Sequence, residues 1–414
     1  MPIAAGALTP NKATDAKPQS DGKPTGDGDR HSGGKPTGDG KSINGLIYPF
    51  GREAPAPGAV QEVSPGIYWL RIDLPFALDH INVWLLRDGN GFVVIDTGLN
   101  GDSTRAIWED TFRTVLQGRP ITRIFVTHMH PDHVGLAGWL AERFDAPLFM
   151  SRTEYLYCRV LASDTGREAP EEGTRYYKKC GFTDEEIEFY RSRFGLFGLG
   201  VHAMPNSYYR LRAGDQVVID GKTWSVVGGA GHSPEHVGFV SRDQGIYISG
   251  DQVLPRISSN IGVWPTEPEA NPLEDWLLAC ASQWTDLPDG LLVLPSHNEP
   301  FTGLHNRLAD LISGHVKALE RLLEDLKSPK RAVDVFSVLF KRDVTKGLLV
   351  MATGEAVAHL NYLWDRDLVT RRMRSDGAFE YQAKKTKVDL AQLLPASVLA
   401  VHEQAESGWR PSVS

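Results

Sequence analysis

The chain has 414 residues, 41% of them hydrophobic, and a formal net charge of −8. This length allows two domains or one large domain with an appendage, and the negative charge argues against a general nucleic-acid-binding surface. Only three cysteines occur, widely spaced, which excludes a disulfide framework and suits a reducing compartment. The sequence has neither an apolar run of roughly eighteen residues nor an N-terminal secretory signal. We therefore expect a cytoplasmic protein with no membrane span and no membrane partner.

The N-terminal segment, residues 1–44, is rich in Gly, Pro, Asp, Lys, Ser and Thr. The heptapeptide Gly-Lys-Pro-Thr-Gly-Asp-Gly occurs in it twice, at 22–28 and 34–40. A segment this poor in apolar residues cannot offset the entropy lost on ordering. We therefore predict a disordered tail, to which we assign no function.

Strands and turns alternate in the next part of the chain. Apolar and β-branched residues indicate strands over 67–74, 81–86 and 92–95, and residues 88–91 are typical of a hairpin turn. Residues 102–117 have a helical pattern. Strands followed by a helix predict a layered α/β core.

The stretch that follows contains a dense group of metal-ligand side chains. Residues 121–126 form a short apolar run typical of a buried strand, and His128-Met-His-Pro-Asp-His133 follows at its end. Imidazole and carboxylate groups are ligands that zinc, iron and manganese accept. His128 and His130 point the same way on an extended segment, whereas Asp132 and His133 lie past the turn and can face a second point. One loop could therefore hold two metal ions.

Residues 151–212 combine helical patterns with many aromatic residues, and they form an insertion between this loop and a later histidine motif. One interpretation is a helical subdomain with its own core, because aromatic stripes are usually buried. The other, which we rank somewhat ahead, is a lid whose side chains shape a substrate pocket over the metals. The candidate lid residues are Tyr176, Tyr177 and Tyr208.

Further strands precede the remaining polar motifs. A hairpin is predicted within 217–227, and apolar strands are predicted at 246–249 and 291–294. A polar motif follows each of the last two strands, so the motifs should converge at one edge of a sandwich, where active sites are built. A helix with one apolar face is predicted over 305–327.

Together, these motifs resemble those of the metallo-β-lactamase superfamily. In chain order, the matching segments are Val93–Gly98, His128–His133, Gly231–His236, Ser249–Asp251 and Pro295–His297. The likeness covers about residues 45 to 325, and five motifs in the family's order are far more specific than one. The resemblance implies an αββα sandwich, which is an α/β layered fold.

The resemblance also implies a site for two divalent metal ions, with zinc as our first choice and iron or manganese as alternatives. The implied ligands are His128, His130 and His232 for the first ion, Asp132, His133 and His297 for the second, and Asp251 between the two. Such a pair of ions shares a hydroxide that acts as the nucleophile, so Asp132 and Asp251 are the candidate catalytic residues. Asp96 is expected to hold a ligand imidazole or the metal loop; an ordinary turn aspartate is the alternative.

The C-terminal part has a different pattern. Helices are predicted at 333–340 and 353–364, and a hairpin within 369–381. This order is similar to the winged-helix-like extension of lactamase-like proteins that include an endoribonuclease. The basic residues there are Arg371, Arg372, Arg374, Lys384, Lys385 and Lys387. They could face phosphates, but such charges more often form a solvated surface, so nucleic-acid contact ranks low.

These patterns divide the chain into four parts. A tail (1–44) precedes a lactamase-like domain (45–328) that contains the insertion. A winged-helix-like domain (329–395) and a second tail (396–414) complete the chain. Self-association through the insertion or the C-terminal domain is left open.

The candidate functions share one site. The cysteines lie outside every motif and an aspartate stands at the bridging position, which argues against an antibiotic-hydrolysing member of the superfamily. We favour a thioesterase similar to glyoxalase II, acting on a small-molecule thioester of glutathione or coenzyme A. The alternatives, in order, are a lactonase or other ester hydrolase, a metal-dependent endoribonuclease, and a non-enzymatic metal-binding protein.

Overall fold

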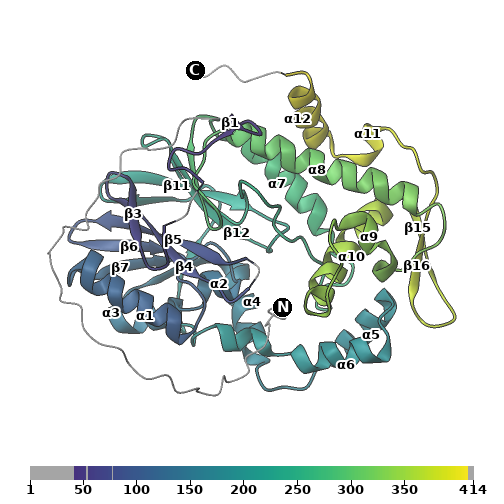
Figure 1. Ribbon diagram of the computed structural model, residues 1–414, viewed down its shortest axis with the longest axis horizontal. Coiled ribbons are helices and arrows are strands. Elements are labelled where there is room, and N and C mark those ends of the chain that lie inside the picture. The colour runs from purple at the N-terminus through teal and green to yellow at the C-terminus, as the bar shows by residue number, and fades with distance from the viewer. Residues whose placement is uncertain (1–41, 53–54, 77, 409–414) are drawn as a thin grey trace, which may run out of the picture.

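Two stacked β-sheets with helices on their outer faces form the body of the protein, and the predicted layered α/β fold is confirmed (Figure 1). The computed structural model describes residues 42–52, 55–76 and 78–408, so residues 1–41 of the predicted tail lie outside the described part. The end of that predicted tail is ordered instead, because Ser42–Ile43 (β1) pair with Leu46–Ile47 (β2) in a short hairpin.

The first sheet contains the strand that leads into the histidine-rich loop. Its strands lie in chain order: β3 (Val60–Ser64), β4 (Ile67–Asp73), β5 (His80–Asp88), β6 (Gly91–Ile95), β7 (Ile121–Phe125), β8 (Leu148–Ser151) and β9 (Tyr209–Leu211). Neighbours from β3 to β6 are antiparallel, whereas those from β6 to β9 are parallel. Parallel strands place their carboxyl ends at the same edge, so the loops after β6 and β7 meet there.

Helices α1 (Asp102–Thr111) and α3 (Ala137–Phe144) cover the outer face of this sheet (Figure 1). Trp108 of α1 and Leu140 of α3 are fully buried in the same apolar cluster as Ile124 of β7. A helix is predicted over 102–117. Its α-helical part ends at Thr111, and the chain continues as a π-helical turn, Phe112–Leu116. This apolar packing fixes the strand that carries the metal loop.

The second sheet packs face to face on the first. Its strands are β10 (Gln216–Ile219), β11 (Lys222–Gly229), β12 (His236–Ser241), β13 (Ile246–Gly250) and β14 (Leu292–Pro295). Large side chains such as Trp84, Phe125 and Phe239 fill the space between the two sheets. The outer face of the second sheet is covered by α7 (Pro272–Asp286) and α8 (Leu304–Asp325), the latter being the predicted helix.

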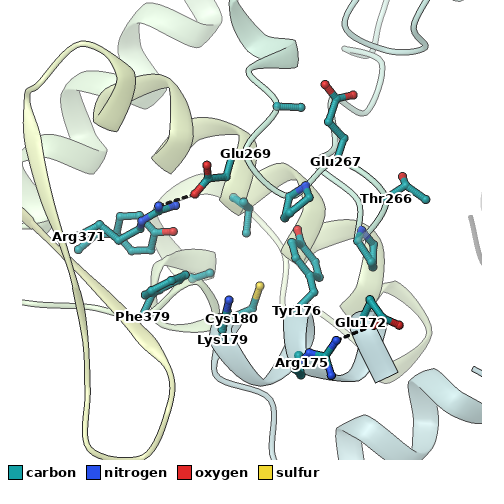
Figure 2. Close-up of a pocket in the computed structure, with 16 residues that line it drawn as sticks. Glu172, Arg175, Tyr176, Lys179, Cys180, Thr266, Glu267, Glu269, Arg371 and Phe379 are labelled. Carbon is teal, nitrogen blue, oxygen red and sulfur yellow. Dashed lines mark hydrogen bonds and ion pairs between the residues drawn. The ribbon is translucent and has the colours of Figure 1, made fainter. Parts of the chain in front are cut away.

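The insertion packs against both the first sheet and the C-terminal part of the chain. Its helices are α4 (Arg152–Ser163), α5 (Glu171–Cys180) and α6 (Asp184–Arg193). Tyr176 and Tyr177 of α5 are buried in the same apolar cluster as Tyr381 from the C-terminal hairpin. Figure 2 shows Tyr176 of α5 and Phe379 of the hairpin among the residues that line a cavity between the two parts.

The C-terminal part contains the predicted helices followed by a hairpin. The expected helix at 333–340 is split into a 3₁₀ turn and α9 (Phe336–Leu339). Helix α10 (Leu349–Asp365) follows, and β15 (Val369–Met373) pairs with β16 (Phe379–Ala383). None of the helices in the described ranges is both long and apolar enough to cross a membrane.

The prediction that residues 396–414 are only a tail is wrong for most of this segment. Residues Ala396–Glu406 form helix α12, which packs on α7 and α8 (Figure 1). The helix buries Val398 and Val401. Two apolar positions in a short segment give too weak a helical period to be recognised without the partner helices.

Candidate metal centre

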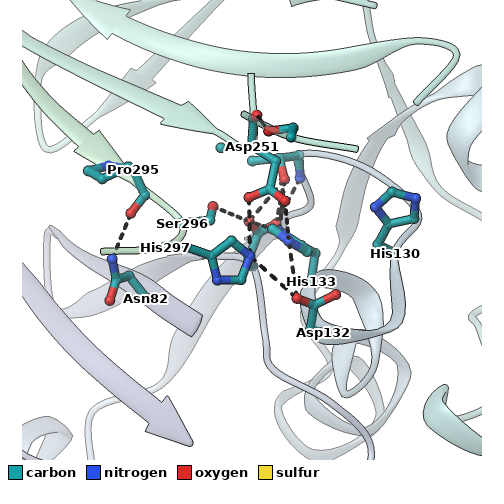
Figure 3. A network of polar contacts seen from close by, with 12 residues as sticks. Asn82, His130, Asp132, His133, Asp251, Pro295, Ser296 and His297 are labelled. Carbon is teal, nitrogen blue, oxygen red and sulfur yellow. Dashed lines mark hydrogen bonds and ion pairs between the residues drawn. The ribbon is translucent and has the colours of Figure 1, made fainter. Parts of the chain in front are cut away.

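Loops at one edge of the two sheets bring the seven predicted ligands together. Figure 3 shows Asp132, His133, Asp251 and His297 of this group close together, with His130 nearby. The loop after β7 supplies His128, His130, Asp132 and His133, the loop before β12 supplies His232, and Asp251 and His297 follow β13 and β14. Pro131 begins a short helix, α2 (Pro131–Val134), so the chain changes direction directly after His130. This turn separates the first two histidines from Asp132 and His133.

The ligand atoms form two groups with Asp251 between them. The first group consists of His128, His130 and His232, and the second of Asp132, His133 and His297; within each, the ligand atoms lie within 4.8 Å of one another. Asp251 Oδ2 is 3.4 Å from His232 Nε2 and 3.6 Å from His133 Nε2. A carboxylate in this position can contact two ions.

The atoms that face the centre of these groups fit divalent cations. Nε2 of His133, His232 and His297, and Oδ1 of Asp251, are buried and have no hydrogen-bond partner within the described part of the chain. Buried polar atoms are nearly always paired, so several unpaired ones in one place need an explanation. A divalent cation provides one, because imidazole nitrogens and carboxylate oxygens are common ligands. The donor set contains no sulfur and suits zinc, iron or manganese.

Fixed acceptors hold the outward ring nitrogens of three ligands. The hydrogen bonds are His133 Nδ1 to Asp96 Oδ2 (2.8 Å), His232 Nδ1 to the Asn260 carbonyl (2.7 Å) and His297 Nδ1 to the His80 carbonyl (2.7 Å). Each bond places the ring proton on Nδ1 and leaves Nε2 as the atom that can bind a cation.

Asp96 makes both of the contacts that the sequence suggested for it. Besides His133, its carboxylate accepts a hydrogen bond from the backbone N–H of Thr127 (2.9 Å), at the start of the metal loop. Its φ is +62°, a left-handed conformation that aspartate tolerates better than most residues. Strained backbone of this kind is typical of functional sites, where the surrounding contacts hold it in place.

Burial and neighbouring charges set the protonation of the ligands. Burial, reinforced by nearby imidazoles, lowers the pKa of His128 and His130 well below the ordinary value, so both rings are neutral. Burial raises the pKa of Asp251, but the contacts with His297 and His133 outweigh it and hold this pKa well below its usual range. Burial lowers the pKa of His133 and His297, but the carboxylates of Asp251 and Asp132 outweigh it and raise this pKa above the ordinary value, so a cation would have to displace a proton from these two rings. A neutral imidazole and an ionised carboxylate are the forms that bind a cation.

Comparison with known families agrees with this geometry. The family model described as "Metallo-beta-lactamase superfamily" matches residues 77–323. The protein belongs to the metallo-β-lactamase superfamily. A second model, described as "Metallo-beta-lactamase-like, C-terminal domain", matches residues 319–384 and so covers α9, α10 and the β15–β16 hairpin.

Relatives of this superfamily member include solved and curated proteins. The crystal structure of a β-lactamase domain protein from Burkholderia ambifaria is 40% identical, covers 82% of this chain and 98% of its own, and has a TM-score of 0.75. The "Probable metallo-hydrolase YqjP" of Bacillus subtilis is 24% identical over 73% of this chain and 93% of its own length. Hydroxyacylglutathione hydrolase GloC of Haemophilus influenzae is 21% identical over 42% of this chain and 67% of its own length. The protein is thus a metallo-hydrolase with candidate sites for divalent metals.

Glu154 is a supporting residue of this superfamily site that the sequence analysis missed. It lies in the first turn of α4 and is fully buried. Its carboxylate accepts hydrogen bonds from the backbone N–H groups of Met129 (2.9 Å) and Glu235 (2.7 Å), which belong to two different metal loops. The insertion therefore contributes a carboxylate that ties these loops together. Nothing in the sequence marks a glutamate in a helical first turn for this role.

His80 and Asn82 of β5 support the last ligand loop. His80 Nε2 accepts a hydrogen bond from the backbone N–H of Asn298 (3.0 Å), directly after the ligand His297. Asn82 Nδ2 donates to the carbonyls of Pro295 (2.8 Å) and Asn298 (2.7 Å) (Figure 3). Asn82 did carry a signal in the sequence, because it is a polar residue inside an otherwise apolar strand.

The lid prediction does not fit the positions of its three tyrosines. We name the cavity that opens onto His232 the metal-side cavity; it has a volume of about 690 Å³. Its lining residues include Tyr157 of α4 but none of the three predicted lid residues, Tyr176, Tyr177 and Tyr208. Tyr208 stacks on Tyr155 at 3.9 Å between ring centroids, and the other two belong to the core. The packing alternative therefore describes Tyr176 and Tyr208, whereas Tyr177 is both a core residue and part of the lining of a second cavity between α4, α5 and α6.

Replacing Tyr176 with phenylalanine should lower stability without changing catalysis. The Tyr176 hydroxyl donates to the Val263 carbonyl (2.9 Å), so its loss should cost about 1 kcal/mol of unfolding free energy. Both kcat and KM should stay within about twofold of the parent protein, because the ring and its packing remain. Tyr157→Phe is the matched control that lines the metal-side cavity. A changed substrate preference in the Tyr176 variant would restore the lid interpretation.

Asn260 links a ligand to the C-terminal part. Its carbonyl accepts from His232, and its side-chain amide donates to Glu355 Oε2 of α10 (2.7 Å). Burial raises the pKa of Glu355 to about 7, although the hydrogen bond from Asn260 opposes this change. The loop that carries Asn260 is therefore fixed from both sides.

Glu355→Gln should stabilise the protein at pH 8 and have little effect at pH 5. Because the folded-state pKa of Glu355 lies above its ordinary value, the stability linked to its proton is present at low pH and lost as pH rises towards and through 7. The variant does not titrate, so its advantage in unfolding free energy should reach about 1 kcal/mol at pH 8. Denaturant unfolding of both proteins at the two pH values tests this, with the exposed Glu320→Gln as control. An equal difference at both pH values would contradict it.

Proposed function

We propose that this metallo-hydrolase cleaves a small-molecule thioester. The observation that carries the proposal is the metal-side cavity, which opens onto the candidate metal centre and has an apolar rim. Leu156 and Val160 of α4 line it and expose 52% and 54% of their surface. Exposed apolar residues around a concave polar centre are typical of a site for a partly apolar small ligand. The relative named hydroxyacylglutathione hydrolase supports an acyl-thiol substrate.

Bound divalent cations would polarise the substrate carbonyl and supply a nucleophile near neutral pH. The chain itself places the donor atoms and limits the access of water. Tyr157 and Trp264 form one wall of the cavity. The Asp132 side chain is 19% exposed, against 8% for Asp251, so Asp132 is the more accessible of the two carboxylates.

Arg152 gives a reason to prefer a carrier-bound acyl group. It lines the metal-side cavity in the first turn of α4, and it forms no ion pair or side-chain hydrogen bond with the described residues. Glutathione and coenzyme A both carry negative charges at some distance from the thioester. A guanidinium at the rim of the cavity would pair with such a charge.

The nuclease alternative is less well supported. Several of the basic hairpin residues are engaged by carboxylates of the chain itself: Arg371 with Glu269 (2.6 Å), Arg374 with Asp376 (3.1 Å), and Lys384 with Asp367. Charges that are already paired contribute less to phosphate binding, which depends on unneutralised cations. We therefore keep nucleic acid behind thioesters, lactones and other esters as a substrate.

The test is thiol release by purified protein of known metal content from acetyl-CoA, benzoyl-CoA and S-lactoylglutathione. Release should be lost on chelation and return with added metal. Arg152→Ala should raise KM for the coenzyme A esters but leave KM for the uncharged N-acetylcysteamine esters unchanged. Cleavage of lactones or oxygen esters without any thiol release from metal-loaded protein would overturn the thioester proposal.

A further inference from the structure

A second cavity adjoins the metal-side cavity. It has a volume of about 400 Å³ and lies between α4, α5 and α6. Tyr157, Trp264 and Thr266 line both cavities, so these side chains form a shared wall. The second cavity thus continues the space above the metal centre, away from the ligands.

The lining of this second cavity, which we name the aromatic cavity, is mostly apolar. Its apolar lining residues include Leu161, Tyr177, Tyr190, Phe194 and Phe197. At its rim, Arg167 pairs with Asp164 (2.7 Å), so these two charges compensate each other. Glu168, Glu172 and Arg193 line it as well, and Glu172 pairs with Arg175 (2.6 Å). The aromatic rings of the lining favour an apolar ligand.

One side-chain hydrogen bond joins two residues of the shared wall. Tyr157 Oη and Thr266 Oγ1 are 2.8 Å apart. Thr266 is exposed, and rotation about its χ1 angle separates the two hydroxyls. This contact is one that a ligand chain passing from the metal-side cavity to the aromatic cavity would have to break.

The cavity of Figure 2 is a weaker continuation. It also reaches Thr266, but it lies towards the C-terminal hairpin, and six of its lining residues are charged: Glu172, Arg175, Lys179, Glu267, Glu269 and Arg371. Arg175 pairs with Glu172 (2.6 Å), and Arg371 with Glu269 (2.6 Å). Glu172 lines both cavities, but the aromatic cavity presents more rings to an apolar chain, among them Tyr190, Phe194 and Phe197.

We infer that the aromatic cavity binds the apolar tail of the acyl group, an aliphatic chain of medium length or an aryl ring. The carbonyl then lies at the metal centre, and the chain crosses the wall beside Tyr157. This inference rests on the proposed function for the reaction itself, but the binding of an apolar chain can be measured without turnover.

The probe is a series of straight-chain carboxylates, from acetate through butanoate and octanoate to dodecanoate, titrated calorimetrically into the metal-loaded protein. Affinity should rise by about fourfold for each methylene that becomes buried, until the cavity is full. Leu161→Trp fills the cavity from α4 and should end this rise at a shorter chain. Phe194→Ala enlarges the cavity and should move the optimum to longer chains.

The controls separate a filled cavity from a damaged fold. Ser163→Trp places the same ring at an exposed position of α4 that lines neither cavity, and the chain-length profile should be unchanged. Opposite shifts by Leu161→Trp and Phe194→Ala, with normal metal content, would support the subsite. A flat profile in the parent protein, or a profile that neither variant moves, would overturn it.

Failure of the subsite and failure of the proposed hydrolysis give different results. A rising chain-length profile without thiol release would keep the subsite and reject the thioester reaction. The opposite result is thiol release with no dependence on chain length, either in the affinity for carboxylates or in kcat/KM for acyl-CoA esters. It would reject the subsite and keep the thioester reaction.

Discussion

Replacing Asp251 with alanine is expected to remove bound metal and nearly all hydrolysis. Asp251 Oδ2 lies between His232 of the first ligand group and His133 of the second, and its Oδ1 is 3.3 Å from His297 Nε2. Its loss removes a ligand from both groups and the negative charge that favours cations there. Metal ions contribute several kcal/mol of transition-state stabilisation, so kcat/KM should fall by about 10³ or more.

Metal analysis of the dialysed protein and the thiol-release assay measure the two effects. The matched control is Asp243→Ala, which makes the same change at an exposed turn between β12 and β13, at the opposite end of β13 from Asp251. It should keep the metal content and the rate of the parent protein. An Asp251 variant that retains both its metal and its activity would exclude a shared role for this carboxylate.

The seven candidate ligands could be predicted because they lie in short motifs that resemble those of the metallo-β-lactamase superfamily, and all of these motifs except the one with His232 follow an apolar strand. The strand pattern places the motifs at one edge, and the spacing of His128 and His130 against Asp132 and His133 separates two groups. The structure brings the same residues together. Ligand groups that are close together in the sequence can therefore be recognised without the structure.

The supporting contacts could not be predicted because they join residues far apart in the chain. Glu154 accepts from the backbone of Glu235, and the Asn260 carbonyl accepts from His232. Backbone groups carry no sequence signal, so only the folded chain reveals these pairs. The positions of Tyr176 and Tyr177 outside the metal-side cavity were missed for the related reason that an aromatic pattern indicates burial but does not identify the packing partner.

Asp96 lies in a recognisable sequence motif, but its contacts with Thr127 and His133 are made with residues far along the chain. Its replacement has the second large expected effect. Asp96→Asn should weaken metal binding by about 10- to 100-fold, the usual cost of losing an outer partner of a ligating histidine. An amide can still accept from Thr127 N through its oxygen, but its NH₂ group cannot accept the His133 Nδ1 proton. The ring is then driven to the tautomer that carries its proton on Nε2, the atom that faces the ligand group.

Competition with a chelator measures the metal affinity of the variant. A control variant separates the effect of the left-handed backbone at this position from the effect of the lost carboxylate. Asp220 also has a positive φ (+50°), in the β10–β11 turn, and its carboxylate accepts from the backbone of Gly89. Asparagine suits left-handed backbone as well as aspartate does, so Asp220→Asn should leave metal affinity unchanged. If Asp96→Asn also left it unchanged, Asp96 would be only a turn residue before Gly98. A loss confined to Asp96 would show that the carboxylate acts through the His133 ring.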